Sequence, residues 1–403
     1  MANFPKIKNL NILLVVASAT IILTLSIGVR GSFGLFMPPV TDSLQISREI
    51  FSFAIAIQML AWGIGQPFFG MLADLYGTRK IIVIGAVLYV SGLVMMGFAT
   101  NPIDLYLGAG CLVGLGTSAM GFAIVLAPVV RTVPNKQRSL ALGIATAGGS
   151  FGQFSIAILS GWLIIVEGWS TALFIIAVIT GTAIILAFGL KNVDSLKVSE
   201  SAQSLKLALN EAANHKGYWL LTIGFFVCGF HITLVGTHVP KYVIDRGLED
   251  WTAAMILSLI GFFNIIGSLL SGYLSSKNSK KIILSCIYFL RGISLCLFIF
   301  TPPSTITSII FGASFGILWL STVPATSGIV AHIFGTKYLG LLYGLVFLSH
   351  QIGSFFGAYL GGLFYDLYGS YDYAWYLAIA LSVFAAIIHL PIKEEPLLRL
   401  KTE

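Results

Sequence analysis

Residues 70–80 read Gly70-Met-Leu-Ala-Asp74-Leu-Tyr-Gly77-Thr-Arg79-Lys80, a short charged stretch between two long apolar runs. A degraded copy, Gly272-Tyr-Leu-Ser-Ser-Lys-Asn-Ser-Lys-Lys281, follows about 200 residues later in a chain of 403 residues. Gly168 and Gly369 repeat at nearly the same offset, each ahead of an aromatic start of the next apolar run. A self-similarity over half the chain length predicts two related halves.

The composition around these stretches is that of a membrane protein. Hydrophobic residues make up 57% of the chain and charged residues only 10%, whereas a soluble domain carries about 25% charged residues. A helix that crosses a bilayer needs about 20 mainly apolar residues. Twelve such runs can be marked, at 11–36, 50–72, 81–99, 104–130, 139–165, 170–190, 218–240, 252–275, 281–300, 305–331, 338–364 and 373–392. They predict an N-terminal half at 1–190, a cytoplasmic linker at 191–216 and a C-terminal half at 217–403.

The basic residues indicate how the runs are oriented. Of 23 Lys and Arg residues, 18 fall in the termini and connections of one predicted side, and only Arg48, Lys241 and Arg246 fall on the other. Lys and Arg are retained on the cytoplasmic side, so the split predicts a multi-pass protein of the inner (plasma) membrane with both termini cytoplasmic. Nucleic acid is excluded as a partner, because the net charge of +7 is not clustered on a polar face with interleaved aromatic residues.

At Gly70 to Lys80 the chain resembles the major facilitator superfamily, whose loop between helices 2 and 3 carries a glycine, an aspartate, a second glycine and a basic pair in this order. The resemblance covers essentially the whole chain. It implies an all-α membrane protein with twelve transmembrane helices in two pseudo-symmetric six-helix bundles, the major facilitator fold, with a substrate site between the halves. It also implies that the loop governs the cytoplasmic gate, where the glycines would let two helices turn tightly and pack closely. The gating residues are then Gly70, Asp74, Gly77, Arg79 and Lys80.

Within that superfamily, three stretches resemble the monocarboxylate and oxalate:formate carrier branch: Ser26-Ile-Gly28 leading to Phe33-Gly34, Arg138-Ser-Leu-Ala-Leu-Gly143, and the eighth run. Animal members of the branch carry an aspartate and an arginine one turn apart on helix 8, where this chain has Asn264 and Ser268. They carry a lysine on helix 1, where this chain has Leu35. The chain therefore departs from the branch at the charges that bind the substrate.

Two arginines lie deep inside apolar runs, Arg30 in the first and Arg291 in the ninth, and neither run contains Asp or Glu. A charge fixed at the bilayer centre costs at least about 2.5 to 3.5 kcal/mol, so each needs a compensating partner, water or an anion. A guanidinium is a planar fork of donors that suits a carboxylate, and the glycines beside Arg30 would let a solute approach it. Both are candidate substrate contacts. The alternative for Arg30 is a side chain that snorkels to the outer boundary or ties backbone carbonyls.

Histidines and uncharged polar residues complete the candidate substrate site. His231 lies in the seventh run and His350-Gln351 in the eleventh, and both helices line the cavity in the family fold. A histidine that titrates near neutral pH can carry a coupled proton or bind an anion; a neutral imidazole bonded to a backbone carbonyl is an equally good interpretation. Other polar groups should face the interior, as ligands or as interhelical hydrogen-bond partners: Gln153, Asn264 and Trp319.

No enzyme site, cofactor or metal is predicted. The glycine-rich runs 143–152 and 353–362 are interpreted as close-packing helix faces, because a phosphate-binding loop follows a strand. The four cysteines lack the spacing of a zinc site. Neither an H-E-x-x-H stretch nor a paired-carboxylate site is found.

The leading functional interpretation is a secondary active transporter of a small organic anion, a monocarboxylate or dicarboxylate, working by alternating access. Coupling to a proton and exchange against a counter-anion both stay open. The first alternative is an exporter of drug-like or amphipathic compounds, which 13% aromatic residues would fit, although a cationic drug would favour an acidic cavity. The alternative of another class is a membrane receptor that does not transport, which usually adds a soluble signalling domain.

Overall fold

The computed structural model describes residues 10–190, 204–335 and 338–397, and in this part of the chain every regular element is a helix. The side chain of Asp74 lies outside the described part. Twelve helical segments among the described residues are long and apolar enough to cross a membrane. Helices dominate because a bilayer offers no water to the backbone, so each span must satisfy its own donors and acceptors. The prediction of an all-α protein with twelve spans is confirmed.

The chain divides into two compact units, Met1–Ile46 with Phe53–Lys197, and Ser47–Ser52 with Val198–Glu403. The predicted linker at 191–216 stays a prediction, because residues 191–203 lie outside the described part. From Ser204 onward this stretch contains a helix that the sequence analysis missed, α10 (Leu205–Ala213). Its N-cap serine accepts a hydrogen bond from the backbone of Leu207, which satisfies one of the free donors at the start of the helix.

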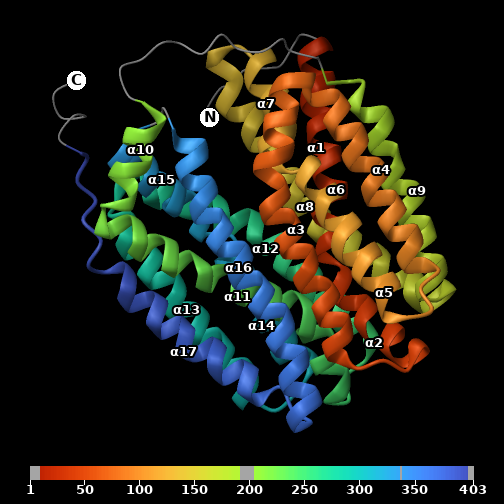
Figure 1. The fold of residues 1–403 in the computed structure, drawn as a ribbon. Helices are drawn as coiled ribbons and strands as arrows, with labels where there is room; N and C mark the ends of the chain where they lie inside the picture. Colours follow the sequence, from red (N-terminus) through yellow and green to blue (C-terminus); the bar gives the residue numbers. More distant parts are fainter. Residues whose placement is uncertain (1–9, 191–203, 336–337, 398–403) are drawn as a thin grey trace, which may run out of the picture. The chain divides into compact units, whose positions relative to one another are not determined.

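The first unit is built on two helix pairs: α1 packs along α8, and α4 packs along α9 (Figure 1). Its elements are α1 (Leu10–Gly31), α2 (Phe33–Leu44), α3 (Arg48–Tyr76), α4 (Thr78–Gly97), α5 (Pro102–Leu105), the π-helix η1 (Tyr106–Leu112), α6 (Val113–Ala119), α7 (Phe122–Thr132), α8 (Asn135–Glu167) and α9 (Trp169–Ala187). The first five residues of α3, 48–52, and the preceding Ser47 are grouped with the second unit.

The second unit repeats this plan, with α11 along α16 and α13 along α17, and α12 and α14 also form a close pair (Figure 1). After α10 its elements are α11 (Lys216–Asp245), α12 (Asp250–Lys277), α13 (Lys280–Phe300), α14 (Thr305–Leu318), α15 (Thr322–Phe334), α16 (Leu339–Tyr368) and α17 (Asp372–His389).

Glycines allow the paired helices of the first unit to approach closely. A Cβ at Gly28 of α1 would lie 2.6 Å from the carbonyl of Gly152 on α8, and a Cβ at Gly152 would collide with the Thr24 carbonyl. The Thr24 hydroxyl also donates to the Gly148 carbonyl at 2.9 Å. The close-packing face predicted on α8 is confirmed at Gly148 and Gly152, whereas a Cβ at Gly143 would meet nothing within 4 Å.

The second unit uses the same device at the corresponding helices. Cβ atoms at Gly353 and Gly357 of α16 would collide with the carbonyls of Phe226 and Phe230 on α11, so the predicted close-packing face is confirmed here too. The first and fifth spans of one half therefore pack in the same way as the seventh and eleventh spans. This likeness is what an internal repeat predicts.

Three spans are interrupted, and the sequence analysis predicted each as one continuous helix. The run predicted at 11–36 is wrong as a single helix, because α1 ends at Gly31 and α2 begins at Phe33, at a Gly/Ser pair of the kind that bends helices. The fourth span breaks between Ala119 and Phe122, and the tenth breaks between Leu318 and Thr322. The last two breaks occupy equivalent places in the two halves.

Candidate functional site

Arg30 stands one residue before the end of α1, in the first unit, with a half-buried side chain. Its Nη1 donates to the thioether sulfur of Met59 at 3.4 Å, and its guanidinium carbon lies 4.8 Å from the centroid of the Trp62 ring. Its Nε is buried without a hydrogen-bond partner. A thioether and an aromatic face are weak partners for a cation, so this guanidinium keeps donor capacity for an anion.

Gln153 lies beside the same end of α1. Its Cγ is 3.2 Å from the position that a Cβ would take at Gly31, the residue after Arg30. The side chain of Gln153 is 5% exposed, and its Oε1 has no hydrogen-bond partner. A larger residue at position 31 would press on this amide, so the glycine keeps Gln153 against α1. The structure therefore places two of the predicted residues, Arg30 and Gln153, at the same end of α1.

Arg291 has different surroundings. It lies on α13 in the second unit and is 0% exposed. Its Nε and Nη2 donate to the Leu318 carbonyl at 3.1 and 2.7 Å, and Nη2 also donates to the Trp319 carbonyl. The last carbonyls of α14 have no partner within their own helix. Arg291 therefore binds backbone oxygens at a helix end, in addition to the Cys228 sulfur, 3.5 Å from Nη2, and the Tyr288 ring, whose centroid is 5.2 Å from the guanidinium carbon.

Two further predicted residues meet at this helix end. Oδ1 of Asn264, on α12, accepts a hydrogen bond from the backbone nitrogen of Leu320 at 3.0 Å. Trp319 is 4% exposed, and its ring lies edge-on to Phe315 with centroids 5.8 Å apart. The structure thus brings Arg291, Asn264 and Trp319 into one cluster around the break in the tenth span.

His350 and Gln351 lie together on α16 of the second unit. Nδ1 of His350 is 2.9 Å from Oε1 of Gln351, and the imidazole stacks on Phe347 with centroids 5.5 Å apart. Cys228, on α11, has its sulfur 3.1 Å from the Thr322 hydroxyl oxygen and 3.5 Å from Nη2 of Arg291. The sequence analysis missed this linking role of Cys228, because a single cysteine inside an apolar run carries no distinguishing pattern.

His231 is bonded to the backbone. Its Nε2 donates to the Ala378 carbonyl of α17 at 2.8 Å, and the residue is 0% exposed. Of the two interpretations of this histidine, these contacts favour the neutral imidazole that satisfies a carbonyl. Its role in transport stays a prediction.

The segment from Gly70 to Lys80 joins α3 to α4. Gly77 adopts a φ of +91°, a conformation that favours glycine, so the tight turn expected there is confirmed. Nη2 of Arg79 donates to the carbonyls of Phe188 and Leu190 beyond the end of α9, at 3.3 and 3.0 Å. Close packing at Gly70 was a wrong expectation, since a Cβ there would meet nothing within 4 Å. The gating role of the segment stays a prediction.

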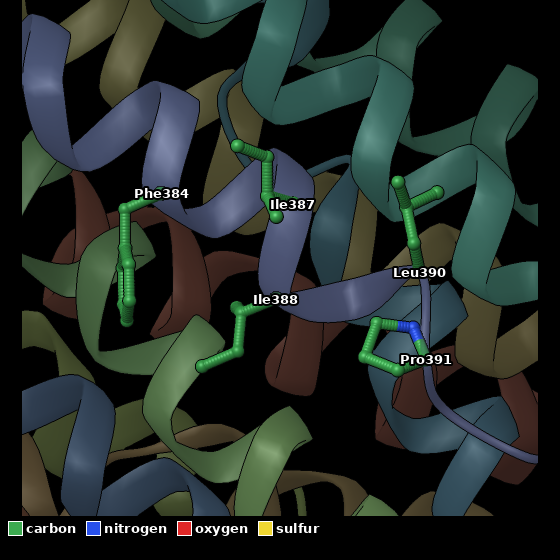
Figure 2. A pocket seen from close by; sticks show the side chains of 5 residues that line it. All are labelled: Phe384, Ile387, Ile388, Leu390 and Pro391. Carbon is green, nitrogen blue, oxygen red and sulfur yellow. The ribbon is translucent and has the colours of Figure 1, made fainter.

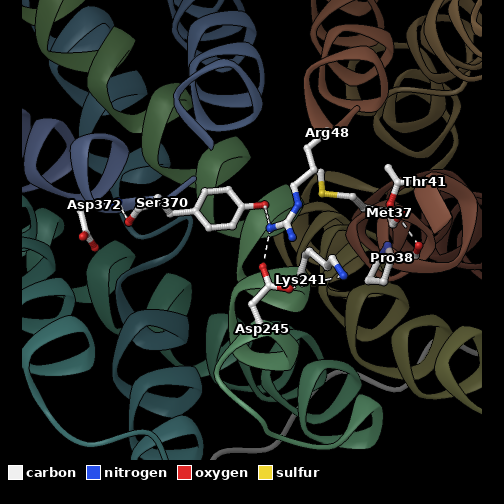
Figure 3. A network of polar contacts seen from close by, with 9 residues as sticks. Met37, Pro38, Thr41, Arg48, Lys241, Asp245, Ser370 and Asp372 are labelled. Carbon is white, nitrogen blue, oxygen red and sulfur yellow. Dashed lines mark hydrogen bonds and ion pairs between the residues drawn. The ribbon is translucent and has the colours of Figure 1, made fainter. Parts of the chain in front are cut away.

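Only three basic residues lie on the predicted side that is poor in Lys and Arg, and two of them pair with the same carboxylate in the second unit. Arg48 and Lys241 both pair with Asp245 (Figure 3), the lysine at 3.4 Å. The Arg48 guanidinium also lies 3.3 Å from the centroid of the Tyr365 ring. Sequence reasoning missed this network, although the rarity of basic residues on that side was a signal for it.

A pocket at the end of α17 is lined by apolar residues only (Figure 2): Phe384, Ile387, Ile388, Leu390 and Pro391. It offers no side-chain donor or charge to an anion. The candidate site for a charged solute therefore rests on the buried cations and not on this pocket.

Comparison with known families decides the class of protein. The model of the Major Facilitator Superfamily matches residues 19–322 and 278–403. The chain belongs to the Major Facilitator Superfamily. The family resemblance inferred from the sequence is confirmed, and with twelve apolar helices the chain is a multi-pass membrane transporter of small solutes and not an enzyme.

Relatives in this superfamily cover nearly the whole chain. It is 26% identical to the uncharacterized MFS-type transporter YcxA of Bacillus subtilis (strain 168) over 378 residues, 90% of each chain. It is also 26% identical to monocarboxylate transporter 13 of Rattus norvegicus over 367 residues, 91% of this chain and 85% of the relative. Among solved structures, a bacterial homolog of the human lysosomal transporter Spinster gives a TM-score of 0.77 at 14% identity, covering 95% of this chain and 97% of that chain. This last likeness shows the fold alone.

Proposed function

We propose that this transporter carries a small organic anion and that Arg30 is the cation that receives it. The observation that supports the proposal is a guanidinium inside a span that contacts a thioether and an aromatic ring, with one buried nitrogen that has no hydrogen-bond partner. Holding a charge in that medium costs at least about 2.5 to 3.5 kcal/mol. A carboxylate accepts two parallel N–H bonds from a guanidinium, so a bound anion would offset much of this cost.

The rat relative's name, monocarboxylate transporter 13, supports a carboxylate as the solute. The charged pair expected on the eighth span of that branch is replaced by Asn264 and Ser268, and the Ser268 hydroxyl donates to Oδ1 of Asn264 at 3.1 Å. No charge is available at these two positions. We therefore place the anion contact on α1, and Gln153 is the neighbouring amide that hydrogen-bonds the solute.

The solute would move by alternating access, coupled to a proton or exchanged against a second anion. For the coupled case we infer that His350, together with Gln351, carries the proton. The ring of His350 contacts side chains that can rearrange, whereas His231 is held by a backbone carbonyl. Exchange of anions would need neither histidine, so the two cases differ in their response to a pH gradient.

Uptake into reconstituted vesicles tests the proposal. A panel of labelled monocarboxylates and dicarboxylates is offered to the wild type with and without a pH gradient. We expect saturable uptake of at least one of them, and Arg30→Gln should raise the apparent KM about tenfold to a hundredfold, the equivalent of one charge-assisted hydrogen-bond pair. Met59→Leu, which alters the neighbouring side chain and keeps the guanidinium, is the matched control and should leave KM within about twofold.

Two results would overturn the proposal. One is transport of neutral or cationic compounds without uptake of any carboxylate. The other is an unchanged KM in Arg30→Gln, provided that size-exclusion chromatography shows the variant to be folded.

A further inference from the structure

The break in the tenth span leaves backbone groups without helical partners. α14 ends at Leu318 and α15 begins at Thr322, so the last carbonyls of α14 and the first amides of the next segment lose their i to i+4 bonds. In a membrane each unsatisfied group costs several kcal/mol. The break can persist only if other groups satisfy this backbone.

Side chains from two neighbouring helices supply the missing partners. Arg291 of α13 donates to the carbonyls of Leu318 and Trp319. Asn264 of α12 accepts from the backbone nitrogen of Leu320, and Ser271 of the same helix donates to the carbonyl of Ser321. Four consecutive residues of the interrupted backbone, from 318 to 321, are thus held from outside their own helix.

The charge of Arg291 fits this position. The C-terminal end of a helix carries partial negative charge, so a cation there is stabilised. A planar guanidinium directs several donors in fixed directions, which suits two adjacent carbonyls better than a lysine ammonium would. Two of the three guanidinium nitrogens of Arg291, Nε and Nη2, are thus bonded to backbone carbonyls, and the third, Nη1, is buried without a hydrogen-bond partner.

At the corresponding break in the first unit, no arginine or lysine among the described side chains donates to the backbone of residues 119–121. There α6 ends at Ala119 and α7 begins at Phe122, and the Ser118 hydroxyl donates to the carbonyl of Trp62 at 2.7 Å. Helix interruption at this place in the repeat thus does not itself require an arginine. Between these two breaks, and for the described side chains, only the one in the tenth span is held by a cation.

We propose that Arg291 is a positioning residue, which holds the interrupted backbone from Leu318 to Ser321 and thereby sets the place of Trp319, and that it does not bind the transported anion. In this assignment the two buried arginines have separate tasks. The inference rests on the proposed function only in naming Arg30 as the anion contact.

A pair of substitutions separates positioning from binding. Arg291→Gln removes the charge, and Arg291→Lys keeps it. A positioning residue predicts that both variants keep the anion KM within about twofold while the maximal rate per folded transporter falls about tenfold in Arg291→Gln. A rise in KM of about tenfold in Arg291→Gln that Arg291→Lys prevents would show an anion ligand and would overturn the proposal.

A second measurement needs no solute. Hydrogen–deuterium exchange of the peptide 316–322 should become faster in Arg291→Gln, while the peptide 116–122 at the other break stays unchanged as an internal control. If Arg291→Gln does not yield folded protein, Ser271→Ala weakens the same backbone without altering charge and should show the same two effects. Unchanged exchange at 316–322 in the folded variant overturns this inference alone, whereas absence of carboxylate uptake by the wild type overturns the proposed function alone.

Discussion

Arg30 and Arg291 each carry a positive charge into an apolar helix, and their partners give them different chemistry. Arg30 contacts Met59 and Trp62, which neutralise little of its charge. Arg291 contacts two carbonyls at the end of α14, where a cation is favoured. A buried cation without a carboxylate partner therefore does not by itself mark an anion site, because backbone carbonyls can also be its partners.

The carboxylate of Asp245 permits a prediction at the same scale. Asp245 pairs with Arg48 and Lys241, and these three side chains are only 11% to 24% exposed. Asp245→Asn would leave two cations facing each other, so we expect it to destabilise the transporter by about 1 to 3 kcal/mol. The measurement is the thermal unfolding midpoint in detergent.

Lys241→Gln serves as the control for that measurement. It removes one cation and leaves the Arg48 to Asp245 pair intact, so the midpoint should fall less than in Asp245→Asn. Equal midpoints for Asp245→Asn and the wild type would contradict a stabilising role for the network.

Helix pairs are joined in both units by glycines that admit a neighbouring backbone. Gly28 and Gly152 face each other across α1 and α8, and Gly353 and Gly357 admit α11 against α16. At such contacts an added methyl group must push the helices apart. The glycine runs are therefore elements of packing, and their spacing on α8 offers a comparison within one helix.

Gly152→Ala and Gly143→Ala make that comparison. A Cβ at Gly152 would collide with the Thr24 carbonyl, so we expect a loss of about 1 to 3 kcal/mol in stability. A Cβ at Gly143 would meet nothing within 4 Å, so alanine should be neutral or stabilising by up to about 1 kcal/mol through its higher helix propensity. Thermal unfolding of the two variants in parallel gives the answer, and a Gly152→Ala protein as stable as the wild type would rule out close packing at this crossing.

At the scale of the whole molecule, one membrane topology fits both the distribution of Lys and Arg and the twelve apolar helices. We expect both termini and the connection at 191–216 on the cytoplasmic side, because 18 of the 23 basic residues fall on the side that includes them. Fluorescent-protein and alkaline-phosphatase fusions at the C-terminus of the chain test this. Strong fluorescence with little phosphatase activity is expected, and the reverse pattern would contradict the predicted orientation.

The sequence predicted the spans well and the interruptions poorly, for a physical reason. Apolar length and charged ends are local properties, so the ends of helices such as α13 (Lys280–Phe300), predicted at 281–300, are readable from composition. The break at Leu318 to Thr322 depends on Arg291 and Asn264, which are distant in sequence, and no periodic pattern encodes it. The same holds for the site: buried arginines could be found by their charge, but whether a ring or a carbonyl faces them is decided by packing.

The interruptions at 120–121 and at 319–321 lie at equivalent places in the two halves, and Arg291 donates to the backbone at the later one. Each half thus contains one such break in a span. A guanidinium holds the later break, whereas hydroxyl groups and glycine lie at the earlier one. We expect the earlier interruption to bend more easily than the later one, where the guanidinium of Arg291 bridges two carbonyls. A single arginine would then make the two halves of a duplicated fold unequal in flexibility.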